Sequence, residues 1–456
     1  MLSSYPVEGP VAYLVERGSQ DMSVTQSKST KKRLRIGFVH RFDARKIRSW
    51  SGIFFFMSRA LEAHVGEVVY LGPDESFGTK FIIDNTARVN RYWQRLTGKI
   101  LATDKNRVLS NRLGRFFERR IRQMPCDVLF APVASVEIAH LKTDLPVVYY
   151  SDITWAQIVD YYPEFTSVSE YGMAEGERIE ASAITRASAA VYPSEWAAES
   201  ACNDYGASRE TTCKVSFGAN LNDPPSRSEA LNRSINGQVK LLLVGVDWIR
   251  KGGAIAYECL TSLLEAGVDA QLTILGCTPP AGEGFEHPNF RVIPFLSKHD
   301  PEQRKQIEQL FLDAHFMLLP TRADATPIVI SEASAFGLPT MATDTGGLGG
   351  SITEGVNGYL LPYEARGEDY AAKIRSVVSE RGRYQALVVS SRDEYEQRLN
   401  WDSWAISMRA VMERVLNREI DPGYPIKPAE TIEESVPAGA DSPETADSLT
   451  AEVSRT

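Results

Sequence analysis

The stretch PTRADATPIVISEASAFGLP, residues 320–339, decides the fold of the region around it. The apolar run before this stretch predicts a buried strand that ends at Pro320. Thr326 then stands at the N-cap position of a helix, and Pro327 stands at its first helical position. Gly337 is the expected stop of that helix. A buried strand, a short turn and a helix in this order form the repeating unit of a parallel α/β sheet.

The turn in this stretch also offers groups that can hold a phosphate. The backbone at Thr326, Pro327 and Ile328 begins the helix, where free N–H groups and a partial positive charge favour an anion. Asp324 lies just before the helix, and Glu332 lies in its second turn, where a carboxylate can accept hydrogen bonds from sugar or ribose hydroxyls. The alternative interpretation is a helix-start acid and an acid on a solvated helix face.

The rest of the chain repeats this alternation of strand and helix. The short runs are apolar on both faces, as parallel strands covered by helices on each side require. The runs of the first half are Leu34–His40, Glu67–Pro73, Asp127–Pro132, Pro146–Asp152 and Ala189–Pro193. The runs of the second half are Lys240–Gly245, Gln271–Gly276, Arg291–Leu296, Phe316–Pro320, Thr340–Thr343 and Tyr359–Pro362. Amphipathic helices such as Ala254–Ala266 and Pro301–Ala314 lie between them.

This pattern predicts an α/β fold made of two Rossmann-like, doubly wound parallel-sheet domains that face a cleft. The segment Ser216–Arg227 is dense in Gly, Asn, Asp and Pro, so we expect it to link the halves. The predicted domains are therefore residues 31–217 and 218–399. A periodic apolar stretch within residues 400–418 predicts a helix that packs back on the first domain.

The charge of the chain is unevenly distributed. The formal net charge is -9 over 456 residues, and residues 419–456 alone hold nine acidic and two basic residues. This segment and residues 1–30 are polar and aperiodic, so we expect both to be disordered tails. The body between them is close to neutral, which argues against a nucleic-acid-binding protein, because such a protein needs a broad basic face.

The cysteines and the apolar runs bear on the compartment. The five cysteines lie far apart without a paired spacing, which favours reduced thiols over a metal or disulfide site. The N-terminus lacks the pattern of a secretory signal, and no apolar stretch approaches the ~18 residues that span a bilayer. We expect a cytoplasmic protein, or one peripheral to the inner face of a membrane.

Residues 105–122 form a basic segment with seven Lys or Arg residues and one acid, Glu118. An apolar stripe at helical spacing runs through the segment at Leu109, Leu113, Phe116, Phe117 and Ile121. A basic amphipathic helix of this kind can touch an anionic membrane or an anionic acceptor. A surface helix that packs its stripe on the core is the alternative.

Several short motifs carry a family resemblance. They are Asp324-x7-Glu332, the loop GVDWIRKGG at Gly245–Gly253, TGG at Thr345–Gly347, GVNGY at Gly355–Tyr359, and Ser51-Gly52 after the first predicted strand. In this order the motifs resemble retaining glycosyltransferase family 4, which has the GT-B fold. The resemblance spans roughly residues 33–417 and is strongest from 240 to 362.

The resemblance implies a nucleotide diphosphate sugar as donor and a carbohydrate or other hydroxyl compound as acceptor. Arg250 and Lys251 would clamp the diphosphate, and Gly346 and Gly347 would add N–H donors. Gly52 would lie near the diphosphate or the acceptor. An ordinary solvated loop is the alternative for the two cations, and a simple turn is the alternative for the glycine pair.

The resemblance also assigns the acids. Asp324 would hold the sugar hydroxyls, although the family usually has Glu there, and Glu332 would hold the ribose. Asp152 aligns with the acid of the family's acceptor domain, with a purely structural role as the alternative. Family members retain the anomeric configuration, usually explained by front-face attack in which the departing phosphate helps to deprotonate the acceptor.

Three further expectations concern metal, cofactor and competing functions. The chain has no Asp-x-Asp pair of the kind that many metal-using glycosyltransferases carry, so we expect neither a metal nor a cofactor. Another enzyme on the same scaffold, such as an epimerase or a phosphorylase, is one alternative function. A non-catalytic sugar-nucleotide-binding protein is the other.

Overall fold

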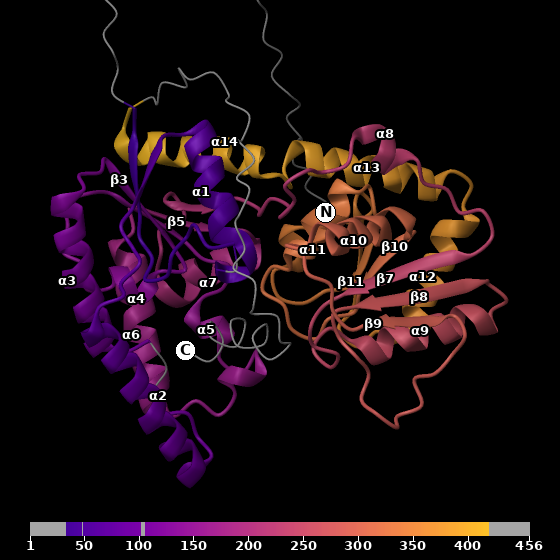
Figure 1. The fold of residues 1–456 in the computed structure, drawn as a ribbon, viewed down its shortest axis with the longest axis horizontal. Helices are drawn as coiled ribbons and strands as arrows, with labels where there is room; N and C mark the ends of the chain where they lie inside the picture. Colours follow the sequence, from indigo (N-terminus) through magenta and orange to yellow (C-terminus); the bar gives the residue numbers. More distant parts are fainter. Residues whose placement is uncertain (1–32, 48, 102–104, 419–456) are drawn as a thin grey trace, which may run out of the picture. The chain divides into compact units, whose positions relative to one another are not determined.

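A computed structural model describes residues 33–47, 49–101 and 105–418 of the chain. Its first sheet lies on the left in Figure 1. This sheet has six parallel strands in the order β2-β1-β3-β4-β5-β6. The strands are β1 (Arg35–Phe38), β2 (Glu67–Tyr70), β3 (Val128–Pro132), β4 (Val147–Tyr150), β5 (Ala189–Tyr192) and β6 (Thr212–Lys214). Five of them were predicted, and β6 was missed because this short, partly exposed edge strand has no apolar run.

The second sheet also has six parallel strands, in the order β12-β11-β10-β7-β8-β9. Its strands are β7 (Val239–Val244), β8 (Ala270–Leu275), β9 (Phe290–Ile293), β10 (Phe316–Leu319), β11 (Thr340–Thr343) and β12 (Gly358–Leu361). All six were predicted. The central strands β10 and β11 are buried at every position, as strands covered by helices on both faces must be. The prediction of two Rossmann-like parallel sheets is confirmed.

Helices cover both faces of each sheet (Figure 1). Those before the second sheet are α1 (Ile53–His64), α2 (Phe77–Thr97), α3 (Arg107–Gln123), α4 (Ser135–Ile138), α5 (Trp155–Ile158), α6 (Glu170–Arg186), α7 (Glu195–Tyr205) and α8 (Arg227–Leu231). The later ones are α9 (Gly253–Glu265), α10 (Pro301–Asp313), α11 (Ile328–Ala335), α12 (Gly367–Ser379), α13 (Arg383–Gln397) and α14 (Trp401–Leu416). Short 3-10 turns are η1 (Ser49–Gly52), η2 (Pro163–Phe165) and η3 (Leu348–Gly350).

The last helix, α14, packs on the first sheet although it follows the second in sequence (Figure 1). Its Trp404 and Met408 are buried among alternate residues of β1, β3, β4 and β5, together with the apolar side of α1. The aromatic rings of Trp404 and Phe130 meet edge to face, with centroids 5.8 Å apart. This is the placement that the apolar periodicity of residues 400–418 predicted.

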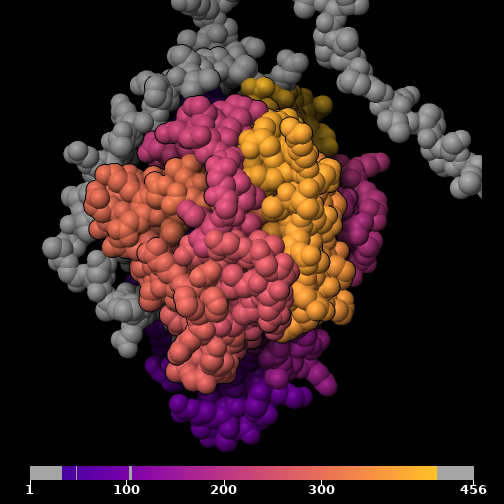
Figure 2. Space-filling view, turned by 90° about the vertical axis from the view of Figure 1, so that its right-hand side faces the viewer, coloured from indigo at the N-terminus to yellow at the C-terminus, as the bar shows by residue number. Residues whose placement is uncertain are grey.

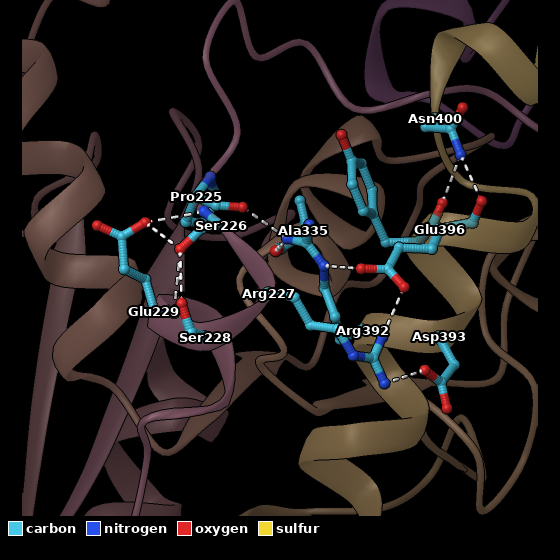
Figure 3. Close-up of polar contacts among 11 residues, drawn as sticks. Pro225, Ser226, Arg227, Ser228, Glu229, Ala335, Arg392, Asp393, Glu396 and Asn400 are labelled. Carbon is cyan, nitrogen blue, oxygen red and sulfur yellow. Dashed lines mark hydrogen bonds and ion pairs between the residues drawn. The ribbon is translucent and has the colours of Figure 1, made fainter.

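The segment that links the sheets is held by contacts rather than by its own secondary structure. Ala219 N donates to Leu399 O over 3.0 Å, so the two crossings of the chain between the sheets run side by side (Figure 2). At the end of the link, Arg227 pairs with Asp393 at 2.6 Å and with Glu396 at 2.5 Å, both on α13 (Figure 3). The Gly- and Pro-rich composition had indicated a loop, and its anchoring became visible only in three dimensions.

Two predictions on the ends of the chain lie outside the described residues, namely the disordered tails at 1–30 and 419–456. Within the described part, no helix is both long and apolar enough to cross a membrane. The basic segment 105–122 forms most of α3, and Leu109, Leu113 and Phe117 of its predicted stripe are fully buried. The packing interpretation therefore holds for the apolar side of α3.

Candidate functional site

The turn between β10 and α11 is the centre of the candidate site. Helix α11 begins at Ile328, and Pro327 is its N-cap with an extended ψ of 114°. The prediction of Thr326 as N-cap is therefore wrong by one residue, because Pro327 has not yet entered the helical conformation. The Thr326 hydroxyl donates instead to Ala325 O over 2.7 Å. No side chain caps α11, so its first N–H groups can bind an anion.

Asp324, in this turn, is paired with both predicted cations. The side chain of Asp324 is buried and forms a close ion pair with Lys251 Nζ. Arg250 Nη1 lies 3.7 Å from Asp324 Oδ2 and donates to Ala323 O over 3.0 Å. Arg250 and Lys251 are adjacent in sequence, and Asp324, 73 positions after Lys251, meets both of them at the carboxyl ends of β7 and β10. In this structure the side chains of Lys251 and Arg250 are therefore paired with a carboxylate of the protein itself.

The loop that carries Arg250 and Lys251 lies directly against the turn. Arg322 N donates to Arg250 O over 2.7 Å, and Thr321 Oγ1 donates to the same carbonyl over 2.9 Å. Gly252 has a left-handed φ of 73°, and a Cβ there would lie 2.0 Å from Pro320 O. Only glycine allows this approach, because it has no Cβ and tolerates positive φ.

Glu332, on α11, pairs with a different cation. Its side chain is almost fully buried and forms a close ion pair with Lys298 Nζ. Lys298 lies in the loop between β9 and α10, and its side chain is half exposed. The sequence interpretation did not include Lys298. A signal was available, since Lys298 follows a predicted strand and ligands bind at the carboxyl ends of strands.

Gly346 and Gly347, after β11, lie against the same turn. Gly346 has a left-handed φ of 54°, and a Cβ on it would lie 2.2 Å from Asp324 O. A Cβ on Gly347 would lie 2.0 Å from Ala325 O. The side chain of Tyr161 also lies against Gly346, and those of Ser194 and Thr326 lie against Gly347, so neither position has room for a Cβ. Their small size permits the packing of the loop after β11 on the loop after β10.

Two tyrosines from the first half, Tyr161 and Tyr162, contact the backbone of this turn. Tyr161 Oη accepts a hydrogen bond from Asp324 N at 3.0 Å, and Tyr162 Oη accepts one from Ala325 N at 2.7 Å. The guanidinium of Arg250 stacks over the Tyr162 ring at 5.6 Å. Burial raises the pKa of Tyr162 well above its usual value, so the hydroxyl stays neutral. No motif marked these tyrosines, which lie in an irregular segment between α5 and η2.

Asp152 follows β4 and is partly exposed. Burial raises its pKa to about 7, and the negative charge of Asp324 adds to the rise. The charges of Asp152 and Asp324 both also act on Tyr162. Asp152 therefore belongs to the same electrostatic environment as the turn before α11, and it exchanges a proton near neutral pH.

Gly52 has a different environment. It precedes α1 with a φ of 86°, after Trp50 and Ser51, which also have positive φ values of 46° and 54°. Asn220 of the linking segment donates to Ser51 O over 2.9 Å and thereby supports this turn. The nearest atoms to a Cβ on Gly52 would belong to Ile47, Asn220 and Phe56. Ile328, at the start of α11, packs on the core cluster that includes the start of α1.

No group of three or more His, Cys, Asp or Glu side chains that could hold a metal ion is found in residues 33–47, 49–101 and 105–418. The chemically active groups of the region are instead two cations against one acid, a second acid with its own lysine, an uncapped helix start and a protonatable carboxyl group. Such a set can bind a diphosphate and the hydroxyls next to it.

Comparison with known proteins adds a family and a fold. Residues 232–394 match the family model described as glycosyl transferases group 1. A D-inositol 3-phosphate glycosyltransferase of Corynebacterium urealyticum is 30% identical over 122 residues, which are 24% of this chain and 28% of that protein. The enzyme of the same name from Rhodococcus jostii is 24% identical over 166 residues, 34% of this chain and 36% of its own. The chain thus spans about a third of the length of these curated relatives.

Solved structures match over more of the chain. Sucrose-phosphate synthase of Thermosynechococcus elongatus aligns with a TM-score of 0.57 at 13% identity, covering 84% of this chain and all of that one. The Anabaena protein HepE, solved in complex with UDP, aligns with a TM-score of 0.55 at 14% identity, with the same coverage of this chain and 100% of its own. At such identities the likeness shows a shared two-domain fold.

Proposed function

We propose that this chain, which belongs through residues 232–394 to the glycosyl transferases group 1 family and has the GT-B fold, transfers a sugar from a nucleotide diphosphate donor to a hydroxyl acceptor. The family and fold expected from the sequence motifs are confirmed. The observation that carries the proposed activity is the meeting of Lys251, Arg250 and Asp324 beside the uncapped start of α11.

The two cations are proposed to change partner when the donor binds. A diphosphate at the start of α11 would compete with Asp324 for Lys251 and Arg250. One opposite charge at ~4 Å in a partly buried site offers about 4 kcal/mol before desolvation is subtracted. As the bond between sugar and phosphate breaks, the leaving group gains negative charge, so the cations stabilise the transition state more than the ground state. Asp324, released from Lys251, can then accept hydrogen bonds from sugar hydroxyls.

Glu332 is proposed to hold the ribose of the donor. Its carboxylate is buried on α11, and Lys298 fixes its orientation from the neighbouring loop. A carboxylate accepts two hydroxyl donors well, which suits the adjacent hydroxyls of a ribose. Lys298 is half exposed, so it can remain paired with Glu332 or turn toward the donor.

We further propose that the anomeric configuration is retained and that no metal takes part. Lys251, Arg250 and the start of α11 supply the positive charge that a divalent cation would otherwise provide. The departing phosphate can accept the proton of the attacking hydroxyl on the same face of the sugar. Asp152, with its pKa raised to about 7, lies near enough to Asp324 to feel its charge and can take or give a proton at the acceptor side.

The acceptor is proposed to be a carbohydrate or another hydroxyl compound. The relatives named D-inositol 3-phosphate glycosyltransferases act on a phosphorylated polyol by name, but they align over short stretches only. We place the reaction in the cytoplasm. The five cysteines are all free, as expected in a reducing compartment.

Donor binding is the first test of this function. UDP-, GDP- and ADP-sugars are screened by thermal unfolding, where a donor at about 100 times its Kd stabilises the protein by about 2.7 kcal/mol. We expect one nucleotide class to stabilise the protein. Stabilisation by none of them would contradict the proposal.

Turnover is the second test. With the stabilising donor and a panel of acceptors, we expect the protein to release nucleoside diphosphate at the same rate with and without EDTA. We also expect NMR of the product to show the same anomeric configuration as in the donor. Inversion or a metal requirement would contradict those parts of the mechanism. Tight binding without turnover on any acceptor would favour a non-catalytic binding protein, and turnover without an acceptor would favour an epimerase.

A further inference from the structure

Helix α2 leaves most of its apolar residues exposed. Within its 21 residues only Thr79 is buried. Phe77, Tyr92 and Leu96 are 82%, 67% and 65% exposed, and Trp93 is 39% exposed. Large apolar side chains gathered on one helix are unusual on a soluble surface, where they normally occur singly. The described residues leave this side of α2 uncovered, so it is available to an external partner.

Five of the exposed apolar residues of α2 lie on one side of the helix. Phe77, Phe81, Val89, Tyr92 and Leu96 recur at intervals of three, four, seven and eight residues, which is the spacing of a single helical stripe. Basic residues lie along one edge of the stripe: Lys80, Arg88, Arg91 and Arg95. An apolar stripe next to a row of cations is the pattern of a helix that lies in the headgroup region of a membrane.

Helix α3 extends this surface with a row of arginines. Arg115, Arg119 and Arg122 are exposed and line a groove of about 840 Å³ beside α2, together with Arg112, Ile82 of α2 and Val108. Arg112 donates to Thr79 Oγ1 over 2.8 Å and to Ser76 Oγ over 2.9 Å, which ties α3 to the start of α2. Val108 is 66% exposed. Leu109, Leu113 and Phe117 of the predicted stripe of α3 are buried, whereas Arg115, Arg119 and Arg122 are exposed.

The charge of the two helices opposes that of the chain. Together α2 and α3 hold ten basic and two acidic residues, whereas the whole chain has a net charge of -9. We propose that α2 and α3 form a docking surface for an anionic lipid bilayer. The exposed aromatic and aliphatic side chains of α2 would enter the headgroup boundary, and the arginines of both helices would bind lipid phosphates.

A bilayer fits this surface better than a nucleic acid. The phosphates of a nucleic acid could bind the arginines, and its bases could stack on Tyr92 or Trp93. A nucleic acid would not, however, bury the exposed aliphatic side chains of Val89 and Leu96. A lipid surface uses all of these residues at once. The proposal goes beyond sugar transfer, because it concerns where the enzyme acts and rests only on residues outside the donor site.

The experiment is co-sedimentation of the full chain with vesicles of phosphatidylcholine alone and of phosphatidylcholine with 30% phosphatidylglycerol. We expect binding to the anionic vesicles that weakens as salt is raised. Since each cation near such a surface contributes about 1 kcal/mol, the triple variant Arg115→Gln, Arg119→Gln, Arg122→Gln is expected to bind on the order of 100-fold more weakly. The variant Tyr92→Ser, Leu96→Ser tests the apolar part, with an expected loss of at least tenfold.

The matched control replaces three exposed cations of the second half, Lys305→Gln, Arg375→Gln and Arg381→Gln, and should bind as the parent does. Thermal unfolding shows whether each variant is folded; the changed side chains are exposed, so no loss is expected. Equal binding to neutral and anionic vesicles, equal effects of the control and the α3 variant, or no vesicle binding with tight binding of single-stranded RNA would each overturn the proposal.

Discussion

The second half of the molecule gathers its candidate residues around one turn, whereas the first half spreads its own over several surfaces. Lys251, Asp324 and Glu332 are each no more than 9% exposed and lie on loops or helices that follow neighbouring strands. In the first half, Asp152 is partly exposed, Gly52 belongs to a separate turn, and the tyrosines that reach the site come from an irregular segment. This difference shows that sequence motifs identify a site more clearly when the site is formed by closely packed loops than when it depends on single side chains.

The largest effect expected from breaking this arrangement is at Lys251. The variant Lys251→Met should lower kcat/KM for the donor about 1,000-fold, near the upper effect of removing one group that stabilises a developing charge. Steady-state kinetics checks this, with the exposed Lys305→Met as control. Because the variant also leaves Asp324 buried without its partner, unfolding must be measured alongside. A folded variant with parental kinetics would show that the second half does not bind the diphosphate through this residue.

The next largest effect is expected at Glu332, whose carboxylate is paired with Lys298. Glu332→Gln should raise the donor KM and lower kcat/KM about 100-fold, because two hydrogen bonds to a charged acceptor are weakened and each is worth about 1.5–3 kcal/mol. Binding of a donor analogue without ribose hydroxyls should change little. If the variant lost affinity equally for the donor and for the analogue without ribose hydroxyls, Glu332 would act on the fold rather than on the ribose.

Gly346 tests the packing of the loops. Gly346→Ala should lower the free energy of unfolding by about 2 kcal/mol or more, since its Cβ would overlap Asp324 O at a left-handed φ. Gly382 also has positive φ, but a Cβ there meets nothing within 4 Å, so Gly382→Ala should cost only about 1 kcal/mol. Denaturant unfolding of the pair measures the difference, and equal costs would argue against the close approach.

The pH dependence of stability tests the environment of Asp152 in the first half. Its pKa is raised to about 7 in the folded protein from an ordinary value of 3.8, so the folded state binds more protons between these values. Stability from this residue is therefore lost as pH rises from about 4 to 7, and the penalty is constant above that range. Asp152→Asn should stabilise the protein by on the order of 1–2 kcal/mol at pH 8 and by nearly nothing at pH 4. A pH-independent effect would contradict the raised pKa.

The smallest effect is expected at Lys298. Lys298→Gln should raise the donor KM about fivefold with kcat unchanged, because the half-exposed lysine only orients Glu332, and such a partly exposed pair is worth about 1 kcal/mol. The double variant with Glu332→Gln should be no worse than Glu332→Gln alone. Additive losses would mean that Lys298 contacts the donor by itself.

Much of the fold could be predicted from local sequence patterns. Eleven of the twelve strands were predicted, since each is a short run that is apolar on both faces, and the exception, β6, is a partly exposed edge strand. The candidate site was predicted in part. Arg250, Lys251, Asp324 and Glu332 were named from motif spacing, but Lys298, Tyr161 and Tyr162 were not, because each acts through one side chain on a loop without periodicity. The N-cap at Thr326 was placed one residue early, since spacing cannot show the ψ of Pro327.

The sequence by itself determined the two parallel sheets, the place of the link between them and the residue types available beside the strand ends. Short runs that are apolar on both faces, and the glycines and prolines between them, are local properties that can be recognised without knowledge of tertiary contacts. Only the tertiary structure decided that Lys251 and Arg250 face Asp324 and that Lys298 holds Glu332. It also decided that the described residues leave the apolar stripe of α2 exposed, while Leu109, Leu113 and Phe117 of α3 are buried. These are pairings between residues distant in sequence, and they depend on how the chain closes in space.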